Sequence, residues 1–215
     1  MPNPTIEELR NPEKYELIAQ LNHSQIKEFV INQLMQNGKI IKFYMIYQIL
    51  MIMIGMFFFT RSIVLAFQSS PVQLYYSLVA LVFSFSVLVI VHELLHGIAL
   101  KLTGAKRVTF GGYLKKFIFY AEADRFVINR RQFGFIALTP LVLVKLITLT
   151  GIILFSSHPV FYFLIFVMSA HSLFCAGDIG LLSVFYRNRE NEIYTFDVKE
   201  EKTSYFYRKI SSDIS

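Results

Sequence analysis

Residues 77–100 read SLVALVFSFSVLVIVHELLHGIAL, an apolar run interrupted by the sequence HELLH at positions 92–96. In an α-helix, residues four positions apart lie on one face about one turn apart, so the imidazoles of His92 and His96 can approach one metal ion. Glu93 lies beside them, where a carboxylate can act as a general base. The pattern therefore predicts a metal site of the HExxH type inside an apolar helix.

The alternative is that three polar residues fell together by chance on a buried helix. Ionisable side chains are costly deep in an apolar segment, and they are retained there mainly for function. The position of His92, Glu93 and His96 within such a segment therefore favours the metal site.

Composition sets the class of protein. Hydrophobic residues make up 54% of the 215 residues, with 22 Phe and 12 Tyr, so we expect a mainly α, polytopic integral membrane protein. The basic residues that give a net charge of +6 flank apolar segments, which indicates membrane topology and no nucleic-acid partner. The single cysteine, Cys175, allows no disulfide or Cys-based zinc site, and we expect it to be a small buried hydrophobe.

Four apolar segments are long enough to cross a bilayer of about 30 Å. They comprise residues 43–67, 74–100, 132–155 and 160–185. Pro140 is expected to kink the third. The loop at 101–131 is rich in Lys and Arg, so the positive-inside rule predicts that this loop and both termini are cytoplasmic. We expect the membrane to be that of a bacterial cell.

The sequence predicts three regions. Residues 1–39 are expected to form two short interfacial helices, 40–186 a membrane metallopeptidase domain, and 187–215 a cytoplasmic tail. The first helix begins at a capping-box pattern, and the second covers about residues 24–37. In the tail, the alternation of Tyr194, Phe196 and Val198 predicts a short strand, and the tail is expected either to pack on the cytoplasmic hairpin or to be partly disordered.

Aromatic and β-branched runs at 108–113 and 117–123 predict a small cytoplasmic β-hairpin between the second and third spans. An exposed strand edge near the metal could bind an unwound substrate as an added strand. Alternatively, the hairpin only caps the membrane domain.

A catalytic zinc uses three protein ligands and leaves a position for water, so a third ligand must come from another segment. Asp178 and His171 are the candidates in apolar surroundings. His92 and Asp178 each lie nine residues before a basic boundary residue, about 13 Å inside the helix end, whereas His171 lies about 10 Å deeper. Depth favours Asp178, although its flanking glycines also fit a polar turn.

Two further polar residues of the predicted spans need an explanation. His171 either lines a substrate path or is a buried histidine hydrogen-bonded to a neighbouring helix. Lys145 lies about 21 Å from the cytoplasmic end of the third span, so it and His171 could border a water or substrate path to the metal. Snorkelling of the Lys145 side chain to the outer interface is an equal alternative.

Three stretches carry a resemblance to a known family. HELLHG at 92–97, FGFIALTP at 133–140 and the pair Gly177-Asp178 resemble the small zincin membrane peptidases, which are similar in layout to the site-two intramembrane proteases. The resemblance covers about residues 75–186. It implies zinc bound by His92, His96 and Asp178, with Glu93 as the base.

The chain departs from the related site-two pattern at the third ligand. Those proteases usually place an Asn and prolines ahead of a Leu-Asp-Gly. Here Ser169-Ala170-His171 and Ala176-Gly177-Asp178 stand instead.

These observations predict a zinc-dependent endopeptidase. Its partners would be the lipid bilayer and a membrane-spanning or membrane-associated protein or peptide, cut near the cytoplasmic face. The alternative is a non-hydrolytic metal-binding membrane protein, such as a transporter or an inactive regulatory homologue. A transporter is expected to carry ligands at several depths and an internal repeat, and neither is evident in the sequence.

Overall fold

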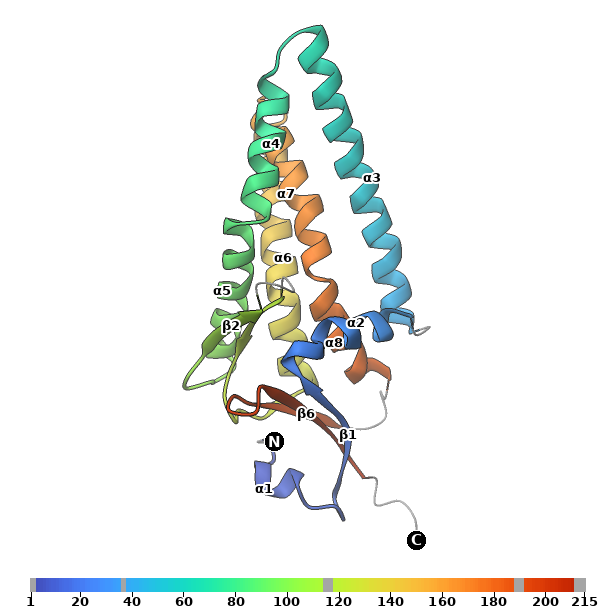
Figure 1. The fold of residues 1–215 in the computed structure, drawn as a ribbon, viewed down its shortest axis with the longest axis vertical. Helices are drawn as coiled ribbons and strands as arrows, with labels where there is room; N and C mark the ends of the chain where they lie inside the picture. Colours follow the sequence, from blue (N-terminus) through green and yellow to red (C-terminus); the bar gives the residue numbers. More distant parts are fainter. Residues whose placement is uncertain (1–2, 36–37, 114–117, 188–191, 211–215) are drawn as a thin grey trace. The chain divides into compact units, whose positions relative to one another are not determined.

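The computed structural model describes residues 3–35, 38–113, 118–187 and 192–210, and these are mainly helical (Figure 1). The chain divides into two compact units. The helical unit comprises Lys42–His92 and Thr139–Ala176. The strand unit comprises Met1–Ile41, Glu93–Leu138 and Gly177–Ser215.

Two helices are long and apolar enough to cross a membrane by themselves: α3 (Lys39–Gln68) and α6 (Arg130–Leu154). At 1.5 Å per residue each exceeds the roughly 30 Å of a bilayer core. These helices agree with the first and third predicted spans, and α6 continues through Pro140.

The second and fourth predicted spans are each a pair of helices joined at a bend. The first pair is α4 (Val72–Ser84) with α5 (Val87–Leu102), bent by 48°, and the second is α7 (Val160–Phe174) with α8 (Ala176–Arg187), bent by 44°. The described chain thus has two to four candidate spans. At the first bend the Ser86 hydroxyl donates to the Val82 carbonyl at 2.6 Å, a side-chain bond that competes with regular helix.

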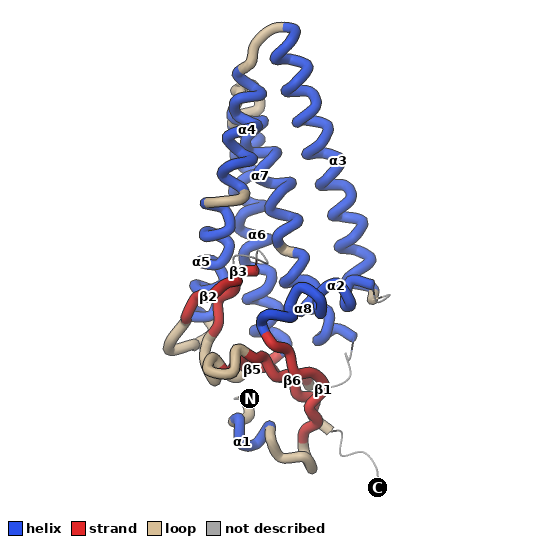
Figure 2. The backbone as a smooth tube through the Cα atoms, in the orientation of Figure 1, coloured by secondary structure: helices blue, strands red, loops and turns tan. Residues whose placement is uncertain are grey.

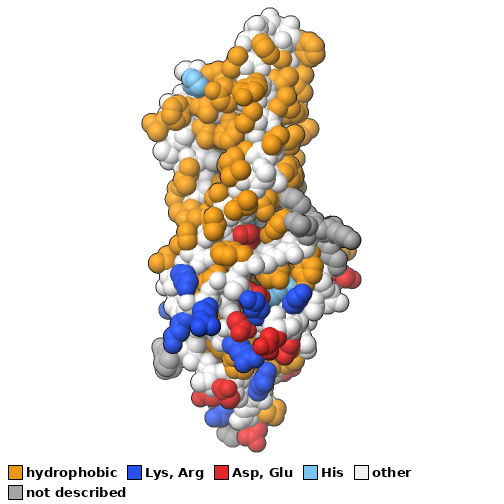
Figure 3. Space-filling view, turned by 60° about the vertical axis from the view of Figure 1, so that its left-hand side comes forward, with side chains coloured by type: hydrophobic (Ala, Val, Ile, Leu, Met, Phe, Trp, Pro, Cys, Tyr) orange, Lys and Arg blue, Asp and Glu red, His pale blue; other side chains and the backbone are white. Residues whose placement is uncertain are grey.

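Small residues let the helices of the helical unit approach closely. A Cβ added at Gly55 of α3 would lie 2.8 Å from Ser169 Cβ of α7, and one at Gly151 would lie 2.8 Å from Leu164 Cδ1. Close backbone approach of this kind is typical of helix packing in membranes. Hydrophobic side chains cover much of the face drawn in Figure 3, and Phe43 and Phe67 of α3 are 81% and 88% exposed.

The strand unit contains an antiparallel four-stranded sheet in the order β1-β6-β5-β4 (Figure 2). Its strands are β1 (Tyr15–Asn22), β6 (Thr203–Lys209), β5 (Ile193–Val198) and β4 (Ile128–Asn129). A separate two-stranded sheet is formed by β2 (Thr109–Tyr113) and β3 (Ile118–Glu122). Two further helices, α1 (Ile6–Leu9) and α2 (Ile26–Met35), lie in the N-terminal segment.

Several local predictions are confirmed. The hairpin is β2 and β3, the short strand of the tail is β5, and Thr5 and Glu8 form the capping box of α1. Residues 114–117, which include the start of the second predicted hairpin strand, lie outside the described residues.

The predicted β content was too small. The N-terminal segment contains β1 between its two helices, and residues 203–209 form β6 instead of a loose tail. The reason is pairing between distant segments: Tyr15 of β1 lies opposite Lys209 of β6. Neither strand has a local signal as clear as the alternation in β5.

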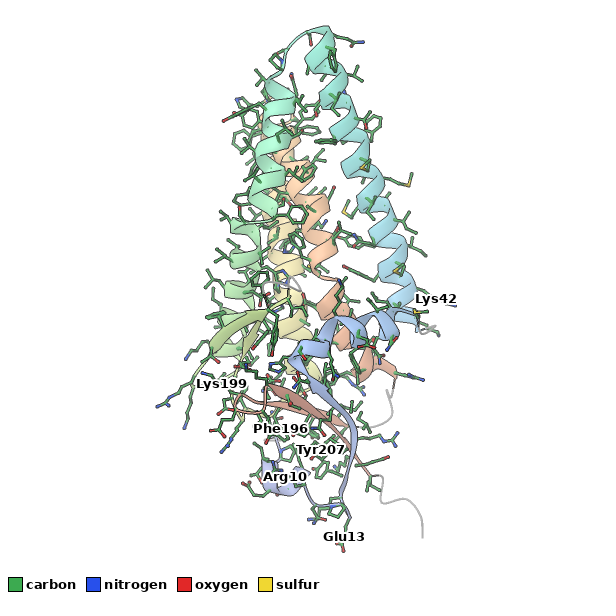
Figure 4. All side chains as sticks on the ribbon, viewed as in Figure 1. Arg10, Glu13, Lys42, Phe196, Lys199 and Tyr207 are labelled. Atoms are coloured by element: carbon green, nitrogen blue, oxygen red, sulfur yellow. The ribbon has the colours of Figure 1, made fainter. Side chains whose placement is uncertain are left out.

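One core of the strand unit lies around Phe196 of β5, which is 1% exposed. Its ring stacks on Tyr207 of β6, with centroids 6.0 Å apart and an interplanar angle of 8° (Figure 4). Leu9 and Val198 belong to the same buried cluster, so this core links α1 to the sheet.

Phe196→Ala is expected to reduce the free energy of unfolding of the strand unit by about 3–5 kcal/mol, because it removes a buried ring and leaves a cavity. Hydrogen exchange of the β5 amides in detergent measures this loss. Phe67→Ala removes the same side chain from an 88% exposed position and should leave these amides unchanged. Equal exchange in Phe196→Ala and wild type would contradict the prediction.

Candidate metal centre

The two motif histidines lie on α5, whose apolar sequence from Val87 to His96 contains neither glycine nor proline. The boundary between the two units falls within this helix, between His92 and Glu93. Because the helix is continuous, the imidazoles of His92 and His96 share one face with an axial separation of about 6 Å. Both side chains are buried, with 5% and 8% exposure.

Asp178 lies in the first turn of α8, within the strand unit. A carboxylate there is favoured by the positive end of the helix dipole. Its Oδ1 atom lies 3.1 Å from Nε2 of His96. The structure thus brings together the second motif histidine and the aspartate predicted as the third ligand.

The spacing of this pair fits a zinc ion. A nitrogen and an oxygen that both bind tetrahedral zinc at about 2.0–2.1 Å lie about 3.3 Å apart, close to the separation of His96 Nε2 and Asp178 Oδ1. Imidazole and carboxylate are also ligands that zinc commonly takes.

His96 is oriented by the main chain of α6. Its Nδ1 lies 3.0 Å from the carbonyl oxygen of Ile136. A carbonyl only accepts, so Nδ1 donates its proton to Ile136, and Nε2 is the nitrogen that faces Asp178 and is left to bind a metal. Such an outer partner is usual for a metal-binding histidine and fixes both its tautomer and its ring orientation.

His92 has a different partner, in the helical unit. Its Nδ1 lies 3.1 Å from Nε2 of His171, which is 1% exposed on α7. One imidazole can donate to the other, so this contact can orient His92 as Ile136 orients His96. Of the two interpretations of His171 from the sequence, the buried histidine bonded to another helix is the one that this geometry favours.

Glu93 lies on α5 directly after His92, and its Oε2 atom is shielded from solvent. Lys145 of α6 belongs to the helical unit. Its Nζ lies 2.9 Å from Met51 Sδ, 3.3 Å from the Met168 carbonyl and 5.0 Å from the centre of the Tyr47 ring. A path shared by Lys145 and His171 stays a prediction.

Residues 85–193 match a family described as "Putative zincin peptidase". The chain belongs to this family. The part that matches the zincin peptidase family contains the HELLH motif, His171 and Asp178, and it supports metallopeptidase chemistry with zinc. No curated protein and no solved structure matches the chain significantly.

Two features of this zincin peptidase centre were missed in the sequence. The Ile136 carbonyl has no sequence signature, because every residue has a carbonyl. Cys175 lies near His171, with Sγ 3.7 Å from Nδ1. The four-residue spacing of these two side chains was a signal that could have been used.

Gly180 lets α2 approach the helix that carries Asp178. A Cβ at Gly180 would lie 2.8 Å from Cγ1 and 3.3 Å from Cβ of Val30, a stiff side chain that is 7% exposed. Gly180→Ala is therefore expected to destabilise the strand unit by about 1–3 kcal/mol, measured as a lower Tm.

Two variants make the Gly180 prediction specific. Adding Val30→Ala removes the clashing methyl groups and should restore most of the lost stability. Gly134→Ala is the matched control, since a Cβ there would have only an ordinary 3.9 Å contact with Leu182. Equal losses in Gly180→Ala and Gly134→Ala would contradict a role for the Val30 contact.

Proposed function

We propose that this chain is a membrane-embedded zinc endopeptidase. The observation that carries the proposal is the 3.1 Å approach of Asp178 to His96, from a different helix, at a spacing that suits zinc. The HELLH helix and the family match support the same chemistry.

In this proposal His92, His96 and Asp178 hold the ion. When bound, zinc supplies Lewis-acid chemistry at the peptide carbonyl. Glu93 removes a proton from the attacking water and delivers it to the leaving nitrogen. Ile136 and His171 keep the two imidazoles in the orientation that this arrangement requires.

The proposed substrate is a membrane-spanning or membrane-associated peptide. Support comes from α3 and α6, which are long enough to span a bilayer, and from the bent pair that contains the motif helix. The basic residues between α5 and α6 favour a cytoplasmic position for the cleavage site and for both chain ends.

Metal removal tests this function. The full chain is reconstituted with single-span peptides in lipid vesicles, and cleavage is followed by mass spectrometry. A zinc chelator should abolish cleavage, and added zinc should restore it. Cleavage that continues after complete zinc removal would overturn the proposal. Bound zinc without cleavage of any peptide in a broad set would favour the non-hydrolytic alternative.

A further inference from the structure

Three possible metal ligands lie together within the helical unit. His92, His171 and Cys175 each offer one ligand atom, and these atoms all lie within 4.8 Å of one another. The three residues are 5%, 1% and 0% exposed. Only His92 belongs to the zinc site proposed above.

The spacing of the two histidine nitrogens is close to that of a shared ion. Two nitrogens bound to one tetrahedral metal lie about 3.3 Å apart, and a nitrogen and a sulfur about 3.6 Å. The structure has 3.1 Å between His92 Nδ1 and His171 Nε2, and 3.7 Å between His171 Nδ1 and Cys175 Sγ. Because these contacts use different nitrogens of His171, an ion at Nε2 requires the Cys175 thiol to rotate toward it, and the three ligand atoms start within 4.8 Å of one another.

The chemistry of the three ligand atoms and their burial determine which metal ion is favoured. A thiolate with two imidazoles favours soft or borderline metals. A net charge is costly in such buried surroundings. One thiolate neutralises a monovalent copper ion, whereas a zinc ion would leave a charge of +1. We propose that His92, His171 and Cys175 form a second metal position that takes Cu(I).

The two positions share His92, so they compete. This step rests on the proposed function, in which Nε2 of His92 faces zinc while Nδ1 carries the proton. A copper ion on Nδ1 takes the place of that proton, which moves to Nε2 and removes the zinc ligand, or passes to water and leaves an imidazolate. A neutral imidazole offers one lone pair, so copper on Nδ1 leaves none for zinc at Nε2, and copper acts as an inhibitor of zinc binding.

The test is an anaerobic competition between the purified full chain and a chromophoric Cu(I) chelator. Wild type should withdraw about one equivalent of copper. Because the chain has a single cysteine, Cys175→Ser removes the only thiolate and should weaken copper binding by more than about 100-fold. His171→Ala should also weaken it strongly. Circular dichroism checks that both variants keep their helices.

The Asp178→Ala variant distinguishes copper binding at the second position from zinc binding at the proposed zinc site. It should lose zinc and still bind copper like wild type, whereas Cys175→Ser should keep its zinc. The second position is overturned if wild type fails to withdraw copper, or if Cys175→Ser withdraws it as tightly as wild type. Neither result depends on whether the chain cleaves peptides.

Discussion

Glu93→Gln should reduce peptide cleavage by about 10²–10⁴-fold, the usual contribution of a positioned general base. The amide keeps the size of the side chain and cannot accept the proton of water. Glu93 is not among the three proposed zinc ligands, so the variant should retain zinc. Initial cleavage rates and elemental analysis of the same sample measure both quantities.

A second acidic residue of the same unit provides a control for Glu93→Gln. Glu122 of β3 is 5% exposed, and its Oε1 accepts a hydrogen bond from Thr109 at 3.1 Å. Glu122→Gln changes a buried carboxylate outside the proposed centre and should leave kcat unchanged when the protein is folded. Undiminished cleavage by Glu93→Gln would show that another group acts as the base.

Asp178→Ala should leave less than about a tenth of the zinc found in wild type, because it removes one of three proposed ligands. The loss should exceed the 10–100-fold effect typical of an outer-shell residue. Elemental analysis after purification without chelator measures it. Cleavage should fall with the zinc content.

The matched control is Asp124→Ala. Asp124 is an exposed aspartate of the strand unit that accepts a hydrogen bond from the Lys199 main chain at 2.9 Å. Its removal should cost no zinc. Full zinc occupancy in Asp178→Ala would reject Asp178 as a ligand, and His171 would then be the residue to test as its replacement.

The residues of the candidate metal centre could be predicted from the sequence better than the sheet could. The HELLH spacing is a local signal, and a depth argument along two helices chose Asp178, which the structure places beside His96. The bend within the second predicted span was missed, and the bend in the fourth was anticipated only as a possible polar turn at the glycines beside Asp178, whereas the helix breaks at Cys175. Such a bend depends on single contacts, for example the Ser86 hydroxyl to the Val82 carbonyl, that hydrophobicity does not reveal.

The four-stranded sheet could not be derived from local patterns. Its edge strand β1 pairs with β6, and the residues of these two strands are separated by most of the chain. An alternating strand such as β5 is visible alone, but β1 is stabilised mainly by its partner. The interpretation of residues 1–39 as helices alone was therefore incomplete.

The two motif histidines differ in how easily mutation can disturb them. His96 is oriented by the Ile136 carbonyl, which every amino acid supplies, so changes at position 136 preserve the acceptor as long as the helix forms. His92 is oriented by the side chain of His171, which any of 19 replacements removes. A random mutant library should therefore tolerate conservative apolar changes at Ile136 and lose function at His171. Mutation can therefore disturb the orientation of His92 more easily than that of His96.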